Sequence, residues 1–278
     1  MKLPAFLINE YRKKLYNTKS LPQDICTVCE EAKCPNRGEC FSKGRVTFLL
    51  LGDTCTRNCG FCGIKKAKAG LPLPPDDAPK IIDTIKRFNI KYLVLTSVTR
   101  DDLPDGGASV FADVIDKVRQ VYPEVKIEVL TPDFKGDTVA IEAVLVKKPY
   151  VFNHNLETVR SGFQQIRPEG NFDVSLKLLE YVKRKDPSIL VKTGIMVGVG
   201  ETKEQVLELI KIVQEKGIDI MTIGQYLAPS KKSFEVKRYV ELEEYEEYIA
   251  LGKSIGLQII AGPLVRSSYM ADTYSVSK

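Results

Sequence analysis

Short apolar runs alternate with helical patterns along most of this 278-residue chain. Most of the runs are almost continuously hydrophobic, as strands buried on both faces of a sheet are. They lie at 46–51, 91–96, 125–130, 150–153, 190–197, 219–224 and 257–261. Repeated strand–helix units predict a parallel sheet, either a full or partial (β/α) barrel or a doubly wound sheet. No GxGxxG motif follows the first run, which disfavours a dinucleotide-binding fold.

Two of the intervening segments have clear helical periodicity. The segment 79–88 has isoleucines and a phenylalanine on one face, and the capping candidates Asp76 and Asp77 precede it. The segment 202–216 has apolar residues at i, i+3, i+4 and i+7, with Thr202 and Gln205 as a capping box and Gly217 as the stop signal. Weaker patterns predict helices at 109–121, 138–146, 171–184 and 240–255.

Six of the seven cysteines form two tight triplets, Cys29, Cys34, Cys40 and Cys55, Cys59, Cys62. Three thiolates suit an iron–sulfur cluster that keeps one iron free for another ligand. A structural zinc site needs four ligands, so zinc is the weaker interpretation. The lone histidine, His154, also disfavours a Ser-His-Asp hydrolase. Cys26 stands outside both triplets, and we expect it to be a spare thiol.

Composition narrows the class of protein further. The chain is long enough to bury its own core and its cysteines are bunched, which favours a reduced, cytoplasmic compartment over disulfide cross-linking. No apolar run is long enough to span a membrane, and the first twenty residues lack a signal-peptide pattern. The net charge is +5, and no aromatic-interleaved basic stripe indicates nucleic-acid binding. Residues 1–45 carry nine Lys and Arg against five Asp and Glu, either a steering surface for an acidic partner or a solvated tail.

In a barrel, chemistry belongs on the loops after the carboxyl ends of the strands. The loop Cys55–Cys62 follows the first predicted strand, and the segment 266–269 follows the last. The first triplet precedes the first strand. The six residues from Cys40 to Val46 span about 20 Å when extended, so this segment is able to reach the same face, although the sequence does not require it.

Several motifs together resemble one family. The Cys55–Cys62 loop has the C-x3-C-x2-C pattern of the radical S-adenosylmethionine superfamily. Around it stand TVCEEAKCPN at 27–36, GDTCTR at 52–57, TSVTRDDL at 96–103, DGGA at 105–108, NHNLET at 153–158 and RSSY at 266–269. In this order, over residues 27–269, the motifs resemble the lipoyl synthase family.

The resemblance implies an α/β fold, a partial (β/α)6-type TIM barrel over 46–261. An N-terminal extension over 1–45 and a C-terminal segment over 262–278 would carry an auxiliary cluster. The implied cofactors are two [4Fe-4S] clusters and S-adenosylmethionine. The cluster on Cys55, Cys59 and Cys62 would cleave S-adenosylmethionine to a radical that abstracts hydrogen from C6 and C8 of a protein-bound octanoyl-lysine. The auxiliary cluster would donate the two sulfurs.

The same resemblance assigns further residues. The auxiliary cluster would be held by Cys29, Cys34, Cys40 and a serine of the RSSY motif, with Ser268 favoured over Ser267. Contacts to the cofactor or substrate are expected from Asn153, His154, Asn155, Gly194, Gly198, Glu201 and Gln225, and Arg57 and Lys192 are candidates for the methionine carboxylate. The glycine-rich segment is also explained as a tight turn, and a lone histidine is more often structural.

The implied partners are octanoylated lipoyl-carrier proteins, namely E2 lipoyl domains and the glycine-cleavage H protein. An electron donor such as ferredoxin or flavodoxin is also implied. Two alternatives remain. One is another radical S-adenosylmethionine enzyme whose auxiliary cluster only relays electrons, and the other is a zinc-stabilised binding module.

Overall fold

A single seven-stranded parallel sheet forms the body of the computed structural model. The structure describes residues 4, 5, 7, 8, 27–31, 34, 36–73, 76–269 and 271–273, so Cys26 lies outside the described residues. The strands follow the order β1-β4-β5-β6-β7-β8-β9. Their bounds are β1 Thr47–Leu50, β4 Tyr92–Ser97, β5 Lys126–Leu130, β6 Val151–Asn153, β7 Leu190–Val197, β8 Ile220–Gln225 and β9 Gln258–Gly262.

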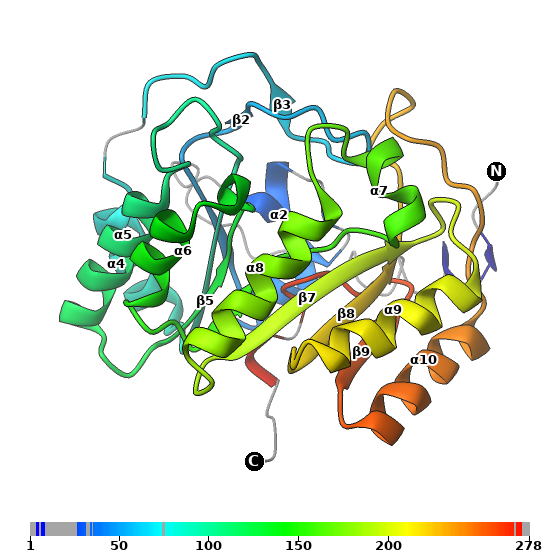
Figure 1. Cartoon of the computed structure of the whole chain (residues 1–278). Helices are drawn as coiled ribbons and strands as arrows, with labels where there is room; N and C mark the ends of the chain where they lie inside the picture. Colours follow the sequence, from blue (N-terminus) through cyan, green and yellow to red (C-terminus); the bar gives the residue numbers. More distant parts are fainter. Residues whose placement is uncertain are drawn as a thin grey trace.

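Helices cover the convex face of this curved sheet (Figure 1). They are α4 Ala78–Phe88, α5 Ala108–Val121, α6 Thr138–Leu145, α7 Arg160–Ile166, α8 Phe172–Lys185, α9 Lys203–Glu215 and α10 Leu242–Ile255. Alternate strand residues such as Leu93, Val129 and Phe152 join the helices in the main hydrophobic core. The other strand face points into the barrel, which is why the strands are hydrophobic on both sides.

Most of the predicted elements are confirmed. Each predicted strand matches an observed one within one or two residues, and so does each predicted helix. The predicted capping box is present, because the Thr202 side chain accepts from Gln205 N–H while the Gln205 side chain accepts from Thr202 N–H. Asp76, rather than the N-cap residue Asp77, accepts a bond from the first-turn backbone. The short elements α2 Val28–Glu31, α3 Arg37–Ser42, β2 Thr54–Cys55, β3 Lys65–Lys66 and the 3₁₀ turns η1 Phe134–Gly136 and η2 Ala271–Thr273 were not predicted.

The barrel interior holds a buried polar cluster. The Glu128 carboxylate accepts bonds from Tyr92 Oη at 2.7 Å, Asn153 Nδ2 at 2.9 Å and Lys192 Nζ at 2.9 Å. Neither Glu128 nor Lys192 has an exposed side chain. A buried charge must be paired, so these four side chains depend on one another.

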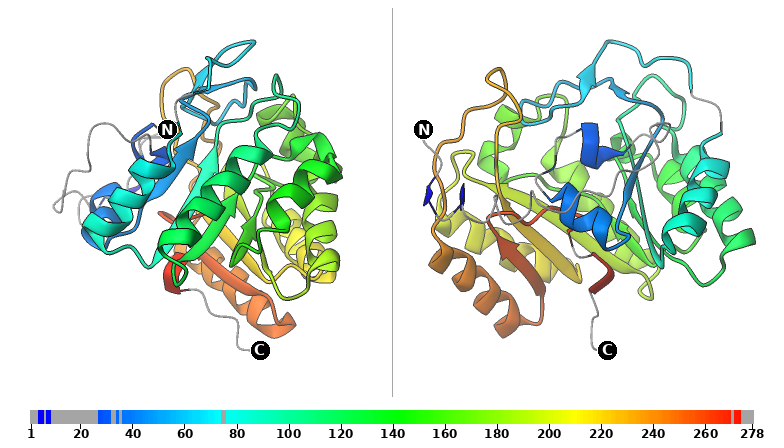
Figure 2. Two further views of the ribbon diagram at one scale, coloured as in Figure 1. Left: turned by 90° about the vertical axis from the view of Figure 1, so that its left-hand side faces the viewer. Right: turned by 180° about the vertical axis from the view of Figure 1, so that it is seen from behind.

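The two edge strands, β1 and β9, do not pair with each other among the described strands, and the barrel is open between them. The segment that carries the first cysteine triplet lies beside β1, where Thr27 bridges Phe48 (Figure 2). The C-terminal segment lies against it: Asn36 Nδ2 donates to Leu264 O at 2.6 Å. An ion pair between Arg45 and Asp272 and a bond from Tyr269 to Glu39 reinforce this contact.

These contacts decide the question that the sequence left open. The first cysteine segment does reach the open side of the barrel, because the C-terminal segment holds it there. None of the described helices is long and apolar enough to cross a membrane.

Candidate active site

The loop from Cys55 to Cys62 is fixed at the carboxyl ends of the strands. Thr56 N–H donates to Thr99 O at 2.9 Å, and Gly60 N–H donates to Ile166 O at 2.8 Å. These bonds join the loop to the segment after β4 and to the last residue of α7. In the first triplet, Cys29 lies in α2 and Cys40 in α3, and Cys34 N–H donates to Cys29 O.

All six of these cysteines are free thiols. Cys34 and Cys40 lie close enough to Cys29 to raise its pKa, and Cys55 and Cys62 do the same to Cys59. Burial is the larger cause: it raises the pKa of Cys29 and of Cys59 to about 12. Burial also raises the pKa of Cys62. These thiols therefore stay protonated at neutral pH without a metal, and iron binding must release their protons.

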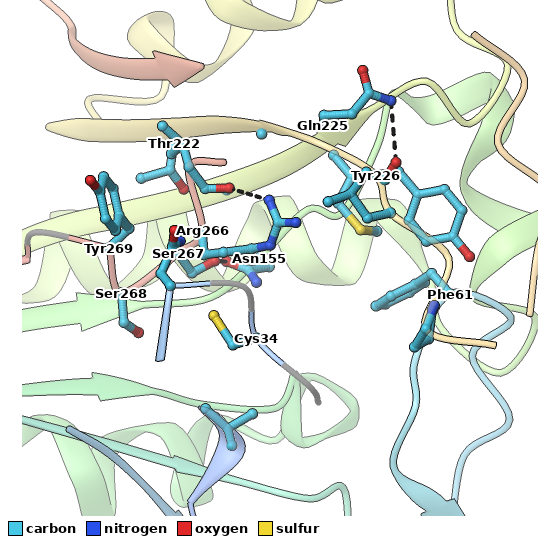
Figure 3. Close-up of a pocket in the computed structure, with 18 of the residues that line it drawn as sticks. Cys34, Phe61, Asn155, Thr222, Gln225, Tyr226, Arg266, Ser267, Ser268 and Tyr269 are labelled. Atoms are coloured by element: carbon cyan, nitrogen blue, oxygen red, sulfur yellow. Dashed lines mark hydrogen bonds between the residues drawn. The ribbon is translucent and has the colours of Figure 1, made fainter. Parts of the chain in front are cut away.

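One cavity of about 1160 Å³ lies inside the barrel mouth and joins the two triplets. Cys29, Cys34 and Cys40 line it on one side and Cys62 on the other. Its wall also includes the predicted residues Asn155, Gly194, Gln225 and Ser268. Figure 3 shows Cys34 beside Arg266, Ser267 and Ser268, with Phe61 and Tyr226 across the cavity.

Both serines of the RSSY motif line this cavity, but they differ in their hydrogen bonding. Ser267 Oγ donates to Asn155 Oδ1 at 2.7 Å. For Ser268, no hydrogen bond to another described residue is present, and its side chain lines the cavity near Cys34. The serine favoured as an iron ligand is therefore the one whose hydroxyl is not engaged by any described residue.

Two of the predicted contact residues are engaged inside the protein instead. His154 is 1% exposed, and its ring nitrogens bond Thr131 O at 2.8 Å and Ser175 Oγ at 3.0 Å. Burial lowers the pKa of His154 to about 4, so the ring is neutral at pH 7. Asn153 is fully buried, and its side chain donates a hydrogen bond to Glu128. Neither side chain lines the cavity, and this corrects the expectation of a direct contact.

The glycine-rich turn after β7 has a mainly structural geometry. Glu201 is 5% exposed and accepts bonds from Gly198 N at 2.6 Å and Val199 N at 2.9 Å. Gly198 has φ +92°, and a Cβ there would lie 2.2 Å from Gln225 Nε2. Gln225 in turn bonds backbone groups at Val197, Tyr226, Arg238 and Val240. These side chains therefore shape the backbone wall, and the expected contacts of Glu201 and Gln225 with the cofactor stay predictions.

The two cations expected at the methionine carboxylate are already paired. Lys192 is buried on Glu128. Arg57 is 3% exposed and binds Asp133 at 2.6 Å and Asp101 at 2.7 Å. A third cation, Arg167, was missed: it binds Asp133 at 3.1 Å, and its charge lowers the pKa of Cys59 against the effect of burial. It belongs to the turn after α7, a short helix that the sequence pattern did not reveal.

Glu157 was quoted only as part of a motif, and the structure places it on the cavity wall. Its backbone has φ +66°, a strained value for a residue with a side chain. Burial raises the pKa of its carboxyl, against the charge of Arg167 and a hydrogen bond with Asn155. Gly194 faces the same point, since a Cβ there would lie 2.9 Å from Asn155 Oδ1. Asn155, Glu157 and Gly194 thus form one polar corner of the cavity.

The donor set fits two iron–sulfur clusters better than a single metal ion. No three His, Cys, Asp or Glu side chains in the described ranges are arranged to hold one ion. A four-iron cluster instead distributes its ligands over separate irons, and two groups of three free thiols beside one cavity match that need. The residues present therefore fit the implied clusters.

Some known proteins resemble this chain in fold, and others also resemble it in sequence. The radical SAM superfamily model matches residues 49–223, so the chain belongs to that superfamily. Among solved structures, Streptococcus suis SuiB bound to S-adenosylmethionine aligns with a TM-score of 0.60 at 13% identity, covering 85% of this chain and 58% of that one. Methylornithine synthase (PylB) aligns with a TM-score of 0.56 at 14% identity, covering 82% and 77%. These neighbours show the fold alone.

Sequence relatives are more specific. Lipoyl synthase of Caldicellulosiruptor saccharolyticus is 48% identical over 88% of this chain and 86% of its own length. Lipoyl synthase of Thermus thermophilus is 46% identical over 88% of this chain and 77% of its own. The chain belongs to the lipoyl synthase family.

It is thus a sulfur-inserting radical S-adenosylmethionine enzyme of lipoate biosynthesis, with [4Fe-4S] clusters and S-adenosylmethionine as cofactors. It acts on lipoyl-carrier proteins.

Proposed function

We propose that this enzyme inserts two sulfur atoms, at C6 and C8 of a protein-bound octanoyl-lysine, and that the sulfur comes from the cluster held by Cys29, Cys34 and Cys40. The observation that carries the proposal is one cavity lined by Cys29, Cys34 and Cys40 of the first triplet and by Cys62 of the second. A substrate carbon in this cavity lies between the site of hydrogen abstraction and a source of sulfide. An auxiliary cluster that only relayed electrons would not need to share the substrate cavity.

The bound clusters and S-adenosylmethionine supply the radical that abstracts hydrogen and the sulfide that replaces it. The chain positions the reactants. The polar corner of Asn155, Glu157 and Gly194 is suited to the hydroxyl groups of a nucleoside. Arg167 is a further candidate for the methionine carboxylate beside Arg57 and Lys192, because its charge acts on Cys59, although it is paired with Asp133 as Arg57 is. The deeper wall, with Val94 and Leu130, is apolar and suits a fatty acyl chain.

Ser268 is the proposed fourth ligand of the auxiliary cluster. Serine oxygen is a harder donor than thiolate and a poorer match for this iron, so it marks the corner at which the cluster is dismantled. Ser267 has a different role in this proposal, since its hydroxyl orients Asn155. We also propose that the chain divides into the parts 1–45, 46–261 and 262–278. The hydrogen bond between Asn36 and Leu264 supports this division, because it joins the first and last parts beside the proposed auxiliary cluster.

Octanoylated E2 lipoyl domains and the glycine-cleavage H protein are the proposed carriers, with ferredoxin or flavodoxin as the electron donor. The grouped cysteines favour a cytoplasmic location.

The exposed residues Ser230 and Lys231 line the cavity, so the acyl-lysine is proposed to enter there. The basic residues of 1–45 are proposed to assist carrier docking. Reversing Arg12, Lys13 and Lys14 to Glu should weaken carrier binding, most strongly at low salt. An unchanged affinity for the carrier protein would show that residues 1–45 take no part in carrier docking.

Iron and acid-labile sulfide per chain, measured after anaerobic reconstitution, test the proposal first. About eight of each indicates two four-iron clusters, and about four indicates that only one triplet holds a cluster. Zinc without iron would support a binding module instead. The loaded enzyme is then given an octanoyl-lysine peptide, S-adenosylmethionine and dithionite. Product that contains sulfur, with loss of the auxiliary cluster during turnover, supports the donor role. Product formed while both clusters stay intact would refute it.

A further inference from the structure

The segment after the Cys55–Cys62 loop combines features that the reaction itself does not use. Between Gly63 and Leu73 the chain has three lysines and no acidic residue. All three lysines are exposed, as are Leu71 at 63% and Leu73 at 45%. Two neighbouring leucines exposed to this degree form an apolar patch rimmed by charged residues, and such a patch indicates a protein interaction surface. We define residues 65–73 as the Lys–Leu segment.

This segment is bonded directly to the cluster-binding loop. Strands β2 and β3 pair in register, with Cys55 opposite Lys66. Ala67 N–H donates to Cys55 O at 3.0 Å, and Lys66 Nζ donates to Cys59 O at 2.8 Å. A protein docked on the segment would therefore contact residues that are hydrogen-bonded to the backbone of Cys55 and Cys59, two of the three cluster ligands.

The segment also lies outside the substrate cavity. Phe61, Cys62 and Gly63 line the cavity, but none of the residues 64–73 does. Figure 1 shows β2 and β3 on the rim of the barrel mouth, where the loop turns outward. The cluster loop thus has an inner side for substrate and an outer side bordered by the Lys–Leu segment.

Neighbouring acidic groups leave the segment positive. Asp53 pairs with Lys65, and Asp102 is held by Arg100 and accepts from Gly70 N–H. Lys66 and Lys68 have no acidic partner among the described residues. The surface therefore attracts a negatively charged protein.

We propose that the Lys–Leu segment is the docking surface for an acidic one-electron carrier protein, which reduces the cluster on Cys55, Cys59 and Cys62. In each transfer the carrier loses one electron and the cluster gains one. A lipoyl-carrier protein is the less suitable occupant, because its octanoyl-lysine must enter the cavity and this segment does not border the cavity. The inference rests on the proposed function, since it requires a cluster at these three cysteines.

The test uses flavodoxin as the probe and Lys68→Glu and Leu71→Ser as variants. Neither side chain has a hydrogen bond to the cluster loop in the described structure. Lys211→Glu is the matched control, because Lys211 is also exposed but lies on α9. Flavodoxin affinity and the stopped-flow rate of hydroquinone oxidation are measured at low and high salt. For Lys68→Glu we expect both to fall on the order of tenfold at low salt, with a smaller difference at high salt. Lys211→Glu is expected to match the wild type.

Equal losses in Lys68→Glu and Lys211→Glu, or no loss in either variant of the segment, would overturn the proposal. So would weaker binding of an octanoylated lipoyl domain with unchanged flavodoxin binding, which would make the segment a carrier site. Dithionite bypasses docking, so S-adenosylmethionine cleavage driven by dithionite should be unchanged in Lys68→Glu. If wild-type enzyme with dithionite inserts no sulfur, the proposed function fails independently of the docking result.

Discussion

Replacing Asp133 by Asn should destabilise the folded protein strongly. The Asp133 carboxylate is 2% exposed and accepts bonds from Arg57 Nη1 at 2.6 Å, Arg57 Nη2 at 2.7 Å and Arg167 Nη2 at 3.1 Å. Burial alone raises the pKa of Asp133, but the bonds from Arg57 and the charge of Arg167 outweigh it and hold the pKa well below its usual range. Asp133 is therefore a shared partner of two buried guanidinium groups, of which Arg57 also binds Asp101.

The expected magnitude follows from the burial. Removing one partner of a buried ion pair costs about 3–5 kcal/mol, because the remaining charge stays buried and uncompensated. With a urea m value on the order of 3 kcal/mol per molar, the unfolding midpoint should fall by about 1 M or more. Equilibrium urea denaturation followed by circular dichroism measures this midpoint, together with the m value as a check of two-state behaviour.

The chain provides a matched control in Asp173→Asn. The Arg160–Asp173 pair has the same 2.6 Å contact as Arg57–Asp133, but both of its side chains are 56% exposed. Water and salt screen such a pair, so the midpoint should stay close to that of the wild type. Equal shifts in the two variants would refute the argument from burial.

The pH dependence gives a second check on Asp133. Its pKa in the folded protein lies below the unfolded value of about 3.9. Its contribution to stability is therefore present above that value and is lost as the pH falls through the folded pKa. The stability difference between wild type and Asp133→Asn should accordingly narrow below about pH 4. A difference that stays constant into acid would show that the carboxylate charge is not its cause.

Three further predictions concern the site and its support. Ser268→Ala should retain S-adenosylmethionine cleavage and lose sulfur insertion, both measured by mass spectrometry, whereas an equal loss in Ser267→Ala would remove the distinction between the serines. Gly198→Ala should lower both the thermal midpoint and S-adenosylmethionine affinity measured by calorimetry, because its Cβ would lie 2.2 Å from Gln225 Nε2; wild-type values would contradict the close approach. His154 has a folded pKa of about 4, below the unfolded value of about 6.5, so wild-type stability should fall as pH drops through this range, and urea midpoints of His154→Gln should show a shallower fall.

Local patterns were sufficient for most of the fold. The strands were recognisable because burial on both faces requires continuous apolar runs, and α9 was recognisable because Thr202 and Gln205 cap it locally. Helices of four to seven residues, such as α2 and α7, were not predicted, because so few residues give no helical periodicity.

The sequence by itself determined the chemistry and the order of elements. Two triplets of thiols within a dozen residues each define iron–sulfur ligation through local spacing alone, and alternating strands and helices define a parallel sheet. Only the tertiary structure brought the first triplet and Cys62 to one cavity, and only it showed that the first triplet's segment binds the C-terminal segment, because Asn36 and Leu264 are 228 positions apart. It also showed that Ser267 binds Asn155 and that Arg57 and Arg167 share Asp133. The partners of a polar side chain depend on which distant segments pack against it, and local spacing in the sequence does not reveal them.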